Sequence, residues 1–205
     1  MPDSRLIVRP ALAEFGKPQR WGRPGGPAGV TVALCEDFQI AAVIARRGAI
    51  PELSERVRRS FAMIPPAGPH RVTNGPLTIL GTGPGRWLFL CETRATDFAD
   101  SLERASMSLA SISDHSDGYA VFEVGGPFVR QALAKGVALN LHPNVFSKAD
   151  AAVTSIAHIG AVLWQIEDAP RYRLAVFRSN AASLWHWLKE SALEFGIETK
   201  SNAVL

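Results

Sequence analysis

Short apolar runs between turn-forming residues are the most regular feature of the chain. They occupy residues 30–37, 38–45, 76–80, 86–92, 119–124, 155–167 and 172–177. Runs of this length bounded by glycine, proline and acidic residues are typical of β-strands. We expect the last two to pair around a turn at 168–171, and the glycine- and proline-rich residues 16–29 to form an extended arm.

Apolar residues at helical spacing predict four helices between these strands. The first begins at Pro51, where proline lacks only an N–H that a helix leaves unpaired. Leu53, Val57 and Phe61 share one of its faces. The other helices are expected from about Thr96 to Leu109, from Pro127 to just before Gly136, and from Ser179 to about Phe195.

The order of these elements predicts an α+β fold with mainly antiparallel sheets and helices packed on them, rather than a doubly wound nucleotide-binding fold. We expect an extended N-terminal arm over residues 1–28, an α+β domain over 29–196, and a loose tail over 197–205. The domain is expected to hold two subdomains, one of them built mainly from about 29–115.

The charge pattern narrows the class of partner. The 205 residues carry a net charge of +3, and the sequence pI is about 9.1. Five arginines lie close together at positions 46, 47, 56, 58 and 59. No aromatic interleaving or nucleic-acid module accompanies them, so we interpret them as a solvated helix face or as a rim that meets an acidic partner.

The sequence predicts a cytoplasmic protein. Its longest apolar runs are far shorter than the ~20 residues of a membrane span, and residues 1–10 lack the apolar core of a secretory signal. Cys35 and Cys91 each lie in an apolar, strand-like run and are too far apart for a Cys-x-x-Cys motif. We therefore expect two buried thiols in a reducing compartment.

The segment "GTGPGRW", residues 81–87, invites comparison with a phosphate-binding loop. Such a loop leads from a strand into a helix, whose N-terminus faces the anion. Here the glycines lead into the apolar run "RWLFL", which is predicted to be a strand. Arg86 and Trp87 stand where a Walker motif needs Lys and Ser or Thr, and Pro84 removes a backbone donor. The segment therefore predicts a hairpin turn.

No combination of residues predicts a catalytic or metal site. The five histidines lack the His-x-x-x-His and His-x-x-Glu spacings of metal ligands. His115 lies in "SDHSD", where a carboxylate can tune its pKa for proton transfer, although such clusters more often form hydrogen-bonded turns. No Gly-x-Ser-x-Gly elbow occurs, and neither cysteine has an evident histidine partner.

Several segments carry a resemblance to a known family. They are "GVTVALCEDFQIAAVIARRG" (29–48), "GTGPGRWLFL" (81–90), "SDHSDGYAVFEVGGPFVRQ" (113–131), "ALAKGVALNLHPNVF" (132–146), "SIAHIGAVLWQI" (155–166) and "FRSNAASLWHWLKESALEFG" (177–196). In this order and spacing they resemble the gamma subunit of heterotetrameric sarcosine oxidase, whose opening hairpin the first segment matches. The resemblance covers most of residues 28–196; Gly125 and Asn140 depart from it where we expect Ser and Asp.

The resemblance implies a fold like the folate-binding domain of aminomethyltransferases, with two intertwined ferredoxin-like subdomains. Those enzymes carry an acidic residue on a strand near the folate. The corresponding residues 70–80 contain no Asp or Glu, and the next strand ends in "CETRATD" without the Asn-Ala of the enzymes. We therefore expect the fold without the catalytic site.

The resemblance also implies a role in a larger enzyme. The family's complex oxidatively demethylates sarcosine, which belongs to sarcosine catabolism and one-carbon metabolism. FAD, FMN and NAD are expected on the alpha and beta subunits, tetrahydrofolate on alpha and zinc on delta. The gamma chain is expected to hold no cofactor, to contact alpha, beta and delta, and to serve assembly and stability without binding nucleic acid or membranes.

The sequence hypothesis is a non-catalytic gamma-type subunit that contacts its partners through the arm, the basic helix and part of the last helix. Exposed Trp and Arg are favoured at protein interfaces. The predicted partner-binding residues are Trp21, Arg56, Arg58, Arg59, Trp187 and Leu193. The alternative is a stand-alone folate-binding, one-carbon transfer protein, in which basic residues hold the glutamate tail of folate.

Overall fold

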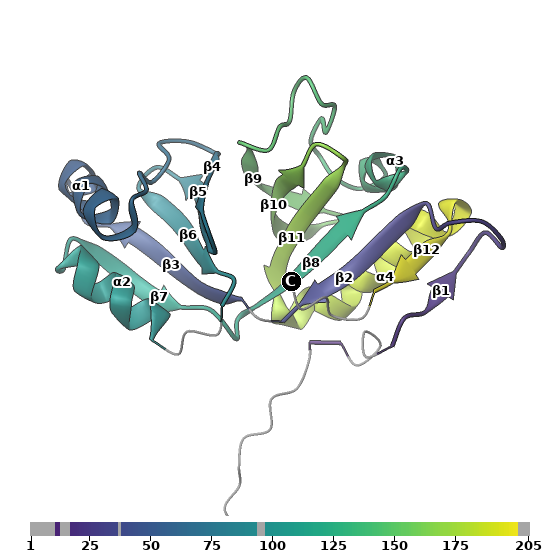
Figure 1. Cartoon of the computed structure of the whole chain (residues 1–205), viewed down its shortest axis with the longest axis horizontal. Helices are drawn as coiled ribbons and strands as arrows, with labels where there is room; N and C mark the ends of the chain where they lie inside the picture. Colours follow the sequence, from purple (N-terminus) through teal and green to yellow (C-terminus); the bar gives the residue numbers. More distant parts are fainter. Residues whose placement is uncertain (1–10, 13–16, 37, 94–96, 201–205) are drawn as a thin grey trace, which may run out of the picture.

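Two β-sheets pack face to face in the computed structural model of the chain, and helices cover the outer face of each sheet (Figure 1). The structure describes residues 11–12, 17–36, 38–93 and 97–200. Strand pairing within them is antiparallel except between β12 and β2. This arrangement confirms the predicted α+β class with mainly antiparallel sheets.

The larger sheet of the described residues has seven strands. Their order is β1 (Arg20–Trp21), β12 (Ile197–Thr199), β2 (Val30–Cys35), β8 (Tyr119–Gly125), β11 (Arg171–Phe177), β10 (Ile159–Glu167) and β9 (Ala151–Ile156). Helices α3 (Val129–Ala134) and α4 (Ala181–Ala192) cover its outer face. The apolar side chains of β8 point to both faces of the sheet. Phe122 and Val124 face these helices, whereas Val121 faces the other sheet.

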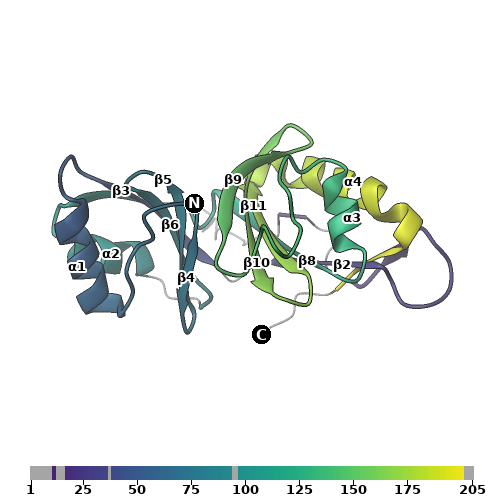
Figure 2. The ribbon, with the colours of Figure 1, turned by 90° about the horizontal axis from the view of Figure 1, so that it is seen from above.

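The smaller sheet of the described residues has five strands. Their order is β4 (Arg71–Asn74), β5 (Leu77–Gly83), β6 (Arg86–Cys91), β3 (Gln39–Ala45) and β7 (Ala110–Asp114). Helices α1 (Ile50–Phe61) and α2 (Phe98–Ser106) cover its outer face, with Leu53, Val57 and Leu102 fully buried against it. Seen from above, the two helix pairs therefore lie at opposite ends of the molecule (Figure 2).

The chain crosses between the sheets, which corrects one prediction. Residues 29–48 were expected to form an opening hairpin, but β2 pairs with β12 and β8 while β3 pairs with β6 and β7. The chain passes back from β7 to β8. Each sheet thus depends on a strand that is adjacent in sequence to a strand of the other sheet, and the two subdomains are intertwined.

Residues 197–199 were expected to lie in a loose tail, but they form β12, which lies between β1 and β2 (Figure 1). Ile197 is fully buried, and the amide of Thr199 donates to the carbonyl of Gln19 over 2.8 Å. The arm and the tail satisfy each other's hydrogen bonds, a pairing across almost the whole chain that local sequence patterns do not reveal. Residues 1–10 and 201–205 lie outside the described residues.

Two element boundaries also differ from the sequence prediction. Residues 155–167 were expected as one strand, but Ala157 and His158 adopt φ values of 47° and 72° and turn the chain between β9 and β10. The second helix ends at Ser106 rather than Leu109, because Met107 takes a left-handed conformation. The residues beyond it enter β7, an edge strand whose polar sequence gave little strand signal.

A latch joins the edge strands of the two sheets. His70 and Asp150 form an isolated antiparallel bridge, and their side chains lie 3.1 Å apart. The amide and hydroxyl of Ser147 also donate to the Asp150 carboxylate, each over 2.8 Å. Burial disfavours ionisation of Asp150, but the hydrogen bonds from Ser147 and His70 outweigh it and hold the pKa of this carboxyl below its ordinary value.

This latch predicts a pH-dependent contribution to stability. A carboxyl with a lowered pKa in the folded state stabilises the fold above its unfolded pKa of about 4, and the contribution disappears as pH falls through the folded pKa. We expect Asp150→Asn to lower the free energy of unfolding by about 1 kcal/mol at neutral pH. Urea unfolding of both proteins from pH 7 down to pH 3 measures this. A difference that stays constant down to pH 3 contradicts the assigned role of the carboxylate.

Candidate functional site

A group of charged side chains around the buried Arg173 lies between the two sheets. Arg173, on β11, donates to both carboxylate oxygens of Glu92, at 2.7 and 3.1 Å, and its Nε donates to Glu123 over 3.1 Å. Glu92 follows β6 of the five-stranded sheet, whereas Glu123 is on β8 of the other. We call Glu92, Glu123 and Arg173 the intersheet ionic cluster; it links the sheets directly.

The electrostatics of the cluster favour a structural role. Burial opposes the charge of Arg173, but the bonds to Glu92 more than compensate and raise the pKa of its guanidinium above the ordinary value. Burial, with Glu123 and Glu92 nearby, raises the pKa of the Cys35 thiol to about 12. Cys35 therefore stays protonated at neutral pH, whereas a nucleophilic cysteine needs its thiolate. Burial and Arg173 lower the pKa of Arg71 beside the cluster.

Sequence reasoning missed this cluster. The available signals were single charged residues inside apolar strands, in "YRLAVF", "YAVFEV" and "LFLCE". A lone charge in such a run is expected only if it is paired or at an edge. The partners are about 50 and 80 positions away, so the sequence offers no local way to pair them.

The glycine segment 81–87 forms a hairpin, as predicted. Residues 84–85 turn the chain between β5 and β6, and Gly81 donates its N–H to the carbonyl of His70 over 2.9 Å. His115 likewise sits in a hydrogen-bonded turn, where Ser116 donates to Asp114 and Gly118 donates to the His115 carbonyl. Within the described residues, no three or more His, Cys, Asp or Glu side chains are placed to hold a metal ion.

The predicted arginines of the basic helix are all tied to acidic or sulfur partners on the protein surface. Arg58 and Arg59 share Glu55, each through contacts of 2.7 Å, and their hydrogen bonds lower the pKa of that carboxyl to about 2. Arg56 pairs with Glu52 at 3.2 Å and contacts the sulfur of Met107 on α2's C-cap. The surface of α1 therefore carries arginine–glutamate ion pairs as well as positive charge.

The predicted residues of the arm and last helix lie at the other end of the molecule and are half-buried. The ring of Trp21 meets that of Trp185 edge-on, with centroids 5.4 Å apart. The Lys189 ammonium lies 5.8 Å from the centre of the Trp21 ring. Trp187 lies against Gly136, where a Cβ would be only 2.5 Å from its ring. The Leu193 carbonyl accepts the N–H of Arg23 over 3.1 Å. The six predicted partner-binding residues thus fall into two groups that the structure does not bring together.

An open hollow of about 390 Å³ lies beside α2. It is lined by Arg46, Asp100, Glu103, Arg104, Met107, Ser108 and Ala110. The lining holds two arginines and two carboxylates, so its formal charges sum to zero. No helix of the described part of the chain is both long and apolar enough to cross a membrane.

The known proteins that the chain resembles in sequence all point to one family. Residues 48–194, more than half of the chain, match the family model described as "Sarcosine oxidase, gamma subunit family". Two curated relatives from Corynebacterium are each named "Sarcosine oxidase subunit gamma". That of strain P-1 is 28% identical over 122 residues, or 58% of this chain and 59% of the relative. That of strain U-96 is 28% identical over 118 residues, or 57% of each. The matches therefore span less than two thirds of these relatives.

Solved structures share the fold. A chain of "Heterotetrameric Sarcosine Oxidase from Corynebacterium sp. U-96 in complex with pyrrole 2-carboxylate" has a TM-score of 0.74 and 24% identity, covering 83% of this chain and 87% of the other. The glycine cleavage system aminomethyltransferase T from Bartonella henselae has a TM-score of 0.61 and 13% identity, covering 84% and 48%. These likenesses confirm the fold that the sequence resemblance implied.

Proposed function

The chain belongs to the sarcosine oxidase gamma subunit family, and from this premise we propose that it is a non-catalytic gamma-type subunit of a heterotetrameric sarcosine oxidase complex. In this role it supports assembly and stability, while other subunits carry out the oxidative demethylation of sarcosine. The family match over residues 48–194 is the observation that carries the proposal.

The interior of the protein agrees with a structural role. The intersheet ionic cluster joins the two sheets, and each of its charges meets an opposite charge at 2.7–3.1 Å. Groups tuned for catalysis more often keep a pKa near the working pH. Here burial moves the pKa of Cys35 away from neutrality.

The proposal extends to the rest of the assembly. We infer that alpha, beta and delta subunits are the partners, and that FAD, FMN, NAD, tetrahydrofolate and zinc are held by those subunits. We place the complex in the cytoplasm, in keeping with the free thiols of Cys35 and Cys91. The partner-binding roles of Trp21, Arg56, Arg58, Arg59, Trp187 and Leu193 remain part of the proposal.

Affinity purification of the tagged full-length chain from its native cells tests the subunit role. We expect a larger flavoprotein to co-purify at one-to-one stoichiometry, with flavin absorbance and sarcosine oxidation in the same fraction. The chain expressed alone is expected to be colourless and inactive, since the chemistry resides on its partners. An untagged strain processed in parallel controls for adventitious recovery.

Two outcomes contradict the proposal. One is sarcosine oxidation by the isolated chain. The other is recovery of the chain from native cells as a colourless monomer that binds tetrahydrofolate on titration, which supports the alternative of a stand-alone one-carbon transfer protein.

A further inference from the structure

The facing surfaces of the two sheets continue beyond the core that they enclose. Ala175 on β11 is fully buried between the sheets, and Phe177 lies two residues further along the same face. In the other sheet, Ile40 and Ala42 belong to the same core, and Ile44 continues their face of β3. On β11 and on β3, one inward-facing apolar residue therefore lies beyond the area that the opposite sheet covers.

These continuing positions are exposed although their neighbours are buried. Phe177 is 52% exposed and Ile44 is 46% exposed. Val153 on β9, which pairs with the buried Val162, is 59% exposed. Single exposed apolar residues are common, but here three such residues extend one buried core outward.

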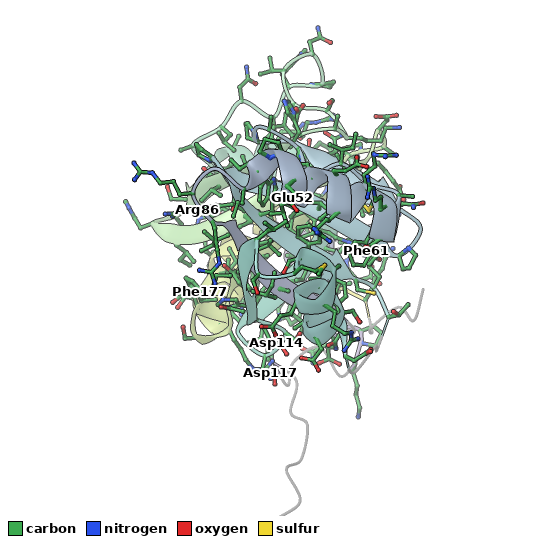
Figure 3. All side chains as sticks on the ribbon, turned by 90° about the vertical axis from the view of Figure 1, so that its left-hand side faces the viewer. Glu52, Phe61, Arg86, Asp114, Asp117 and Phe177 are labelled. Carbon is green, nitrogen blue, oxygen red and sulfur yellow. The ribbon has the colours of Figure 1, made fainter. Side chains whose placement is uncertain are left out.

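An exposed arginine stands directly beside Ile44. Arg86 is the cross-strand partner of Ile44, and among the described residues no carboxylate pairs with it. In the view of Figure 3, Arg86 and Phe177 are labelled on the same side, with Asp114 and Asp117 below them. We call Ile44, Arg86, Tyr119, Val153 and Phe177 the intersheet margin.

The aromatic part of the margin is held in place before any partner arrives. The rings of Tyr119 and Phe177 stack with centroids 5.1 Å apart, and His115 meets Tyr119 edge-on at 5.9 Å. Aromatic and arginine side chains dominate the binding energy of protein interfaces, and prior ordering lowers the entropic cost of association.

We propose that the intersheet margin is a docking face for another subunit of the complex, and this inference rests on the proposed function. The partner places apolar side chains against Ile44 and Phe177 and a carboxylate against Arg86. The charge pattern favours a protein over a polyanion, since nucleic acids and anionic lipids require clusters of cations. Because Arg86 has no carboxylate partner among the described residues, it is suited to a single carboxylate of the partner.

Co-purification of tagged variants from native cells lacking the wild-type chain tests this proposal. We expect Phe177→Asp and Ile44→Asp each to reduce recovery of the flavoprotein partner at least about tenfold. Arg86→Glu is expected to weaken recovery less and in a salt-dependent way. Val145→Asp is the matched control, since Val145 is 60% exposed and lies in the loop before β9; it is expected to recover the partner as wild type does.

A second measurement does not depend on how the substitutions affect folding. A photo-crosslinking phenylalanine analogue at position 177 is expected to form a covalent adduct with the partner, whereas the same analogue at position 145 is not. Wild-type recovery by both aspartate variants, or no adduct from position 177 while the tagged wild type binds its partner, overturns the docking face but leaves the subunit role standing. Failure of the wild-type chain to recover any partner overturns both.

Discussion

Replacing Arg173 with methionine is expected to destabilise the protein by about 3–5 kcal/mol, far more than the loss of a charge from its surface. The Arg173 side chain is only 6% exposed, and its loss leaves Glu92 and Glu123 without their shared cation. Urea unfolding of the purified chain, followed by circular dichroism, measures the change. For a chain of this length the midpoint of thermal unfolding is expected to fall by roughly 10 °C.

Arg171→Met is the matched control on the same strand. Arg171 is 39% exposed and contacts Glu123 at 3.4 Å and Glu167 at 3.2 Å, so its removal is expected to cost less than about 1 kcal/mol. Adding Glu92→Leu to the Arg173→Met protein is expected to recover part of the loss, because it removes a stranded carboxylate. Equal effects of Arg173→Met and Arg171→Met would falsify the assigned role of the intersheet ionic cluster.

Gly81→Ala is expected to cost about 3 kcal/mol, a large effect for one added methyl group. A Cβ at this position would lie 1.9 Å from the carbonyl oxygen of Gly68. The obstacle is backbone, and the chain there is held by the hydrogen bond from Gly81 to His70. The glycine is therefore required for the close approach of the 65–70 loop rather than for binding a phosphate.

Gly160→Ala is the control for glycine replacement within a strand. Nothing lies within 4 Å of a Cβ built on Gly160. The free energy of unfolding is expected to change by less than about 0.5 kcal/mol, or to rise slightly because alanine restricts the unfolded chain. Denaturant titration of both variants measures the difference, and a Gly81→Ala protein as stable as Gly160→Ala contradicts the packing argument.

Local patterns were sufficient for most of the secondary structure and for the fold class. The helical spacing of Leu53, Val57 and Phe61 identified α1, and the turn at 168–171 correctly joined β10 to β11. Such signals depend on residues a few positions apart, so one sequence contains them completely. The edge strands β4 and β7 were missed because they are short and mostly polar.

The candidate sites show the limit of the same reasoning. Trp21 was identified as a residue of the arm with no evident core position, but its packing on Trp185 depends on the pairing of β1 with β12. The intersheet ionic cluster and the intersheet margin were not predicted at all. Each combines residues from both sheets, and no local pattern specifies which residues meet there.

The order of residues along the chain was enough to establish the apolar periodicity, the turn chemistry and the family to which the chain belongs. The folded structure was needed to show that β2 and β3 enter different sheets, that β12 closes onto the arm, and that Arg173 meets Glu92. This division arises because burial and charge pairing are properties of neighbours in space. Here those neighbours are separated by up to almost the full length of the chain.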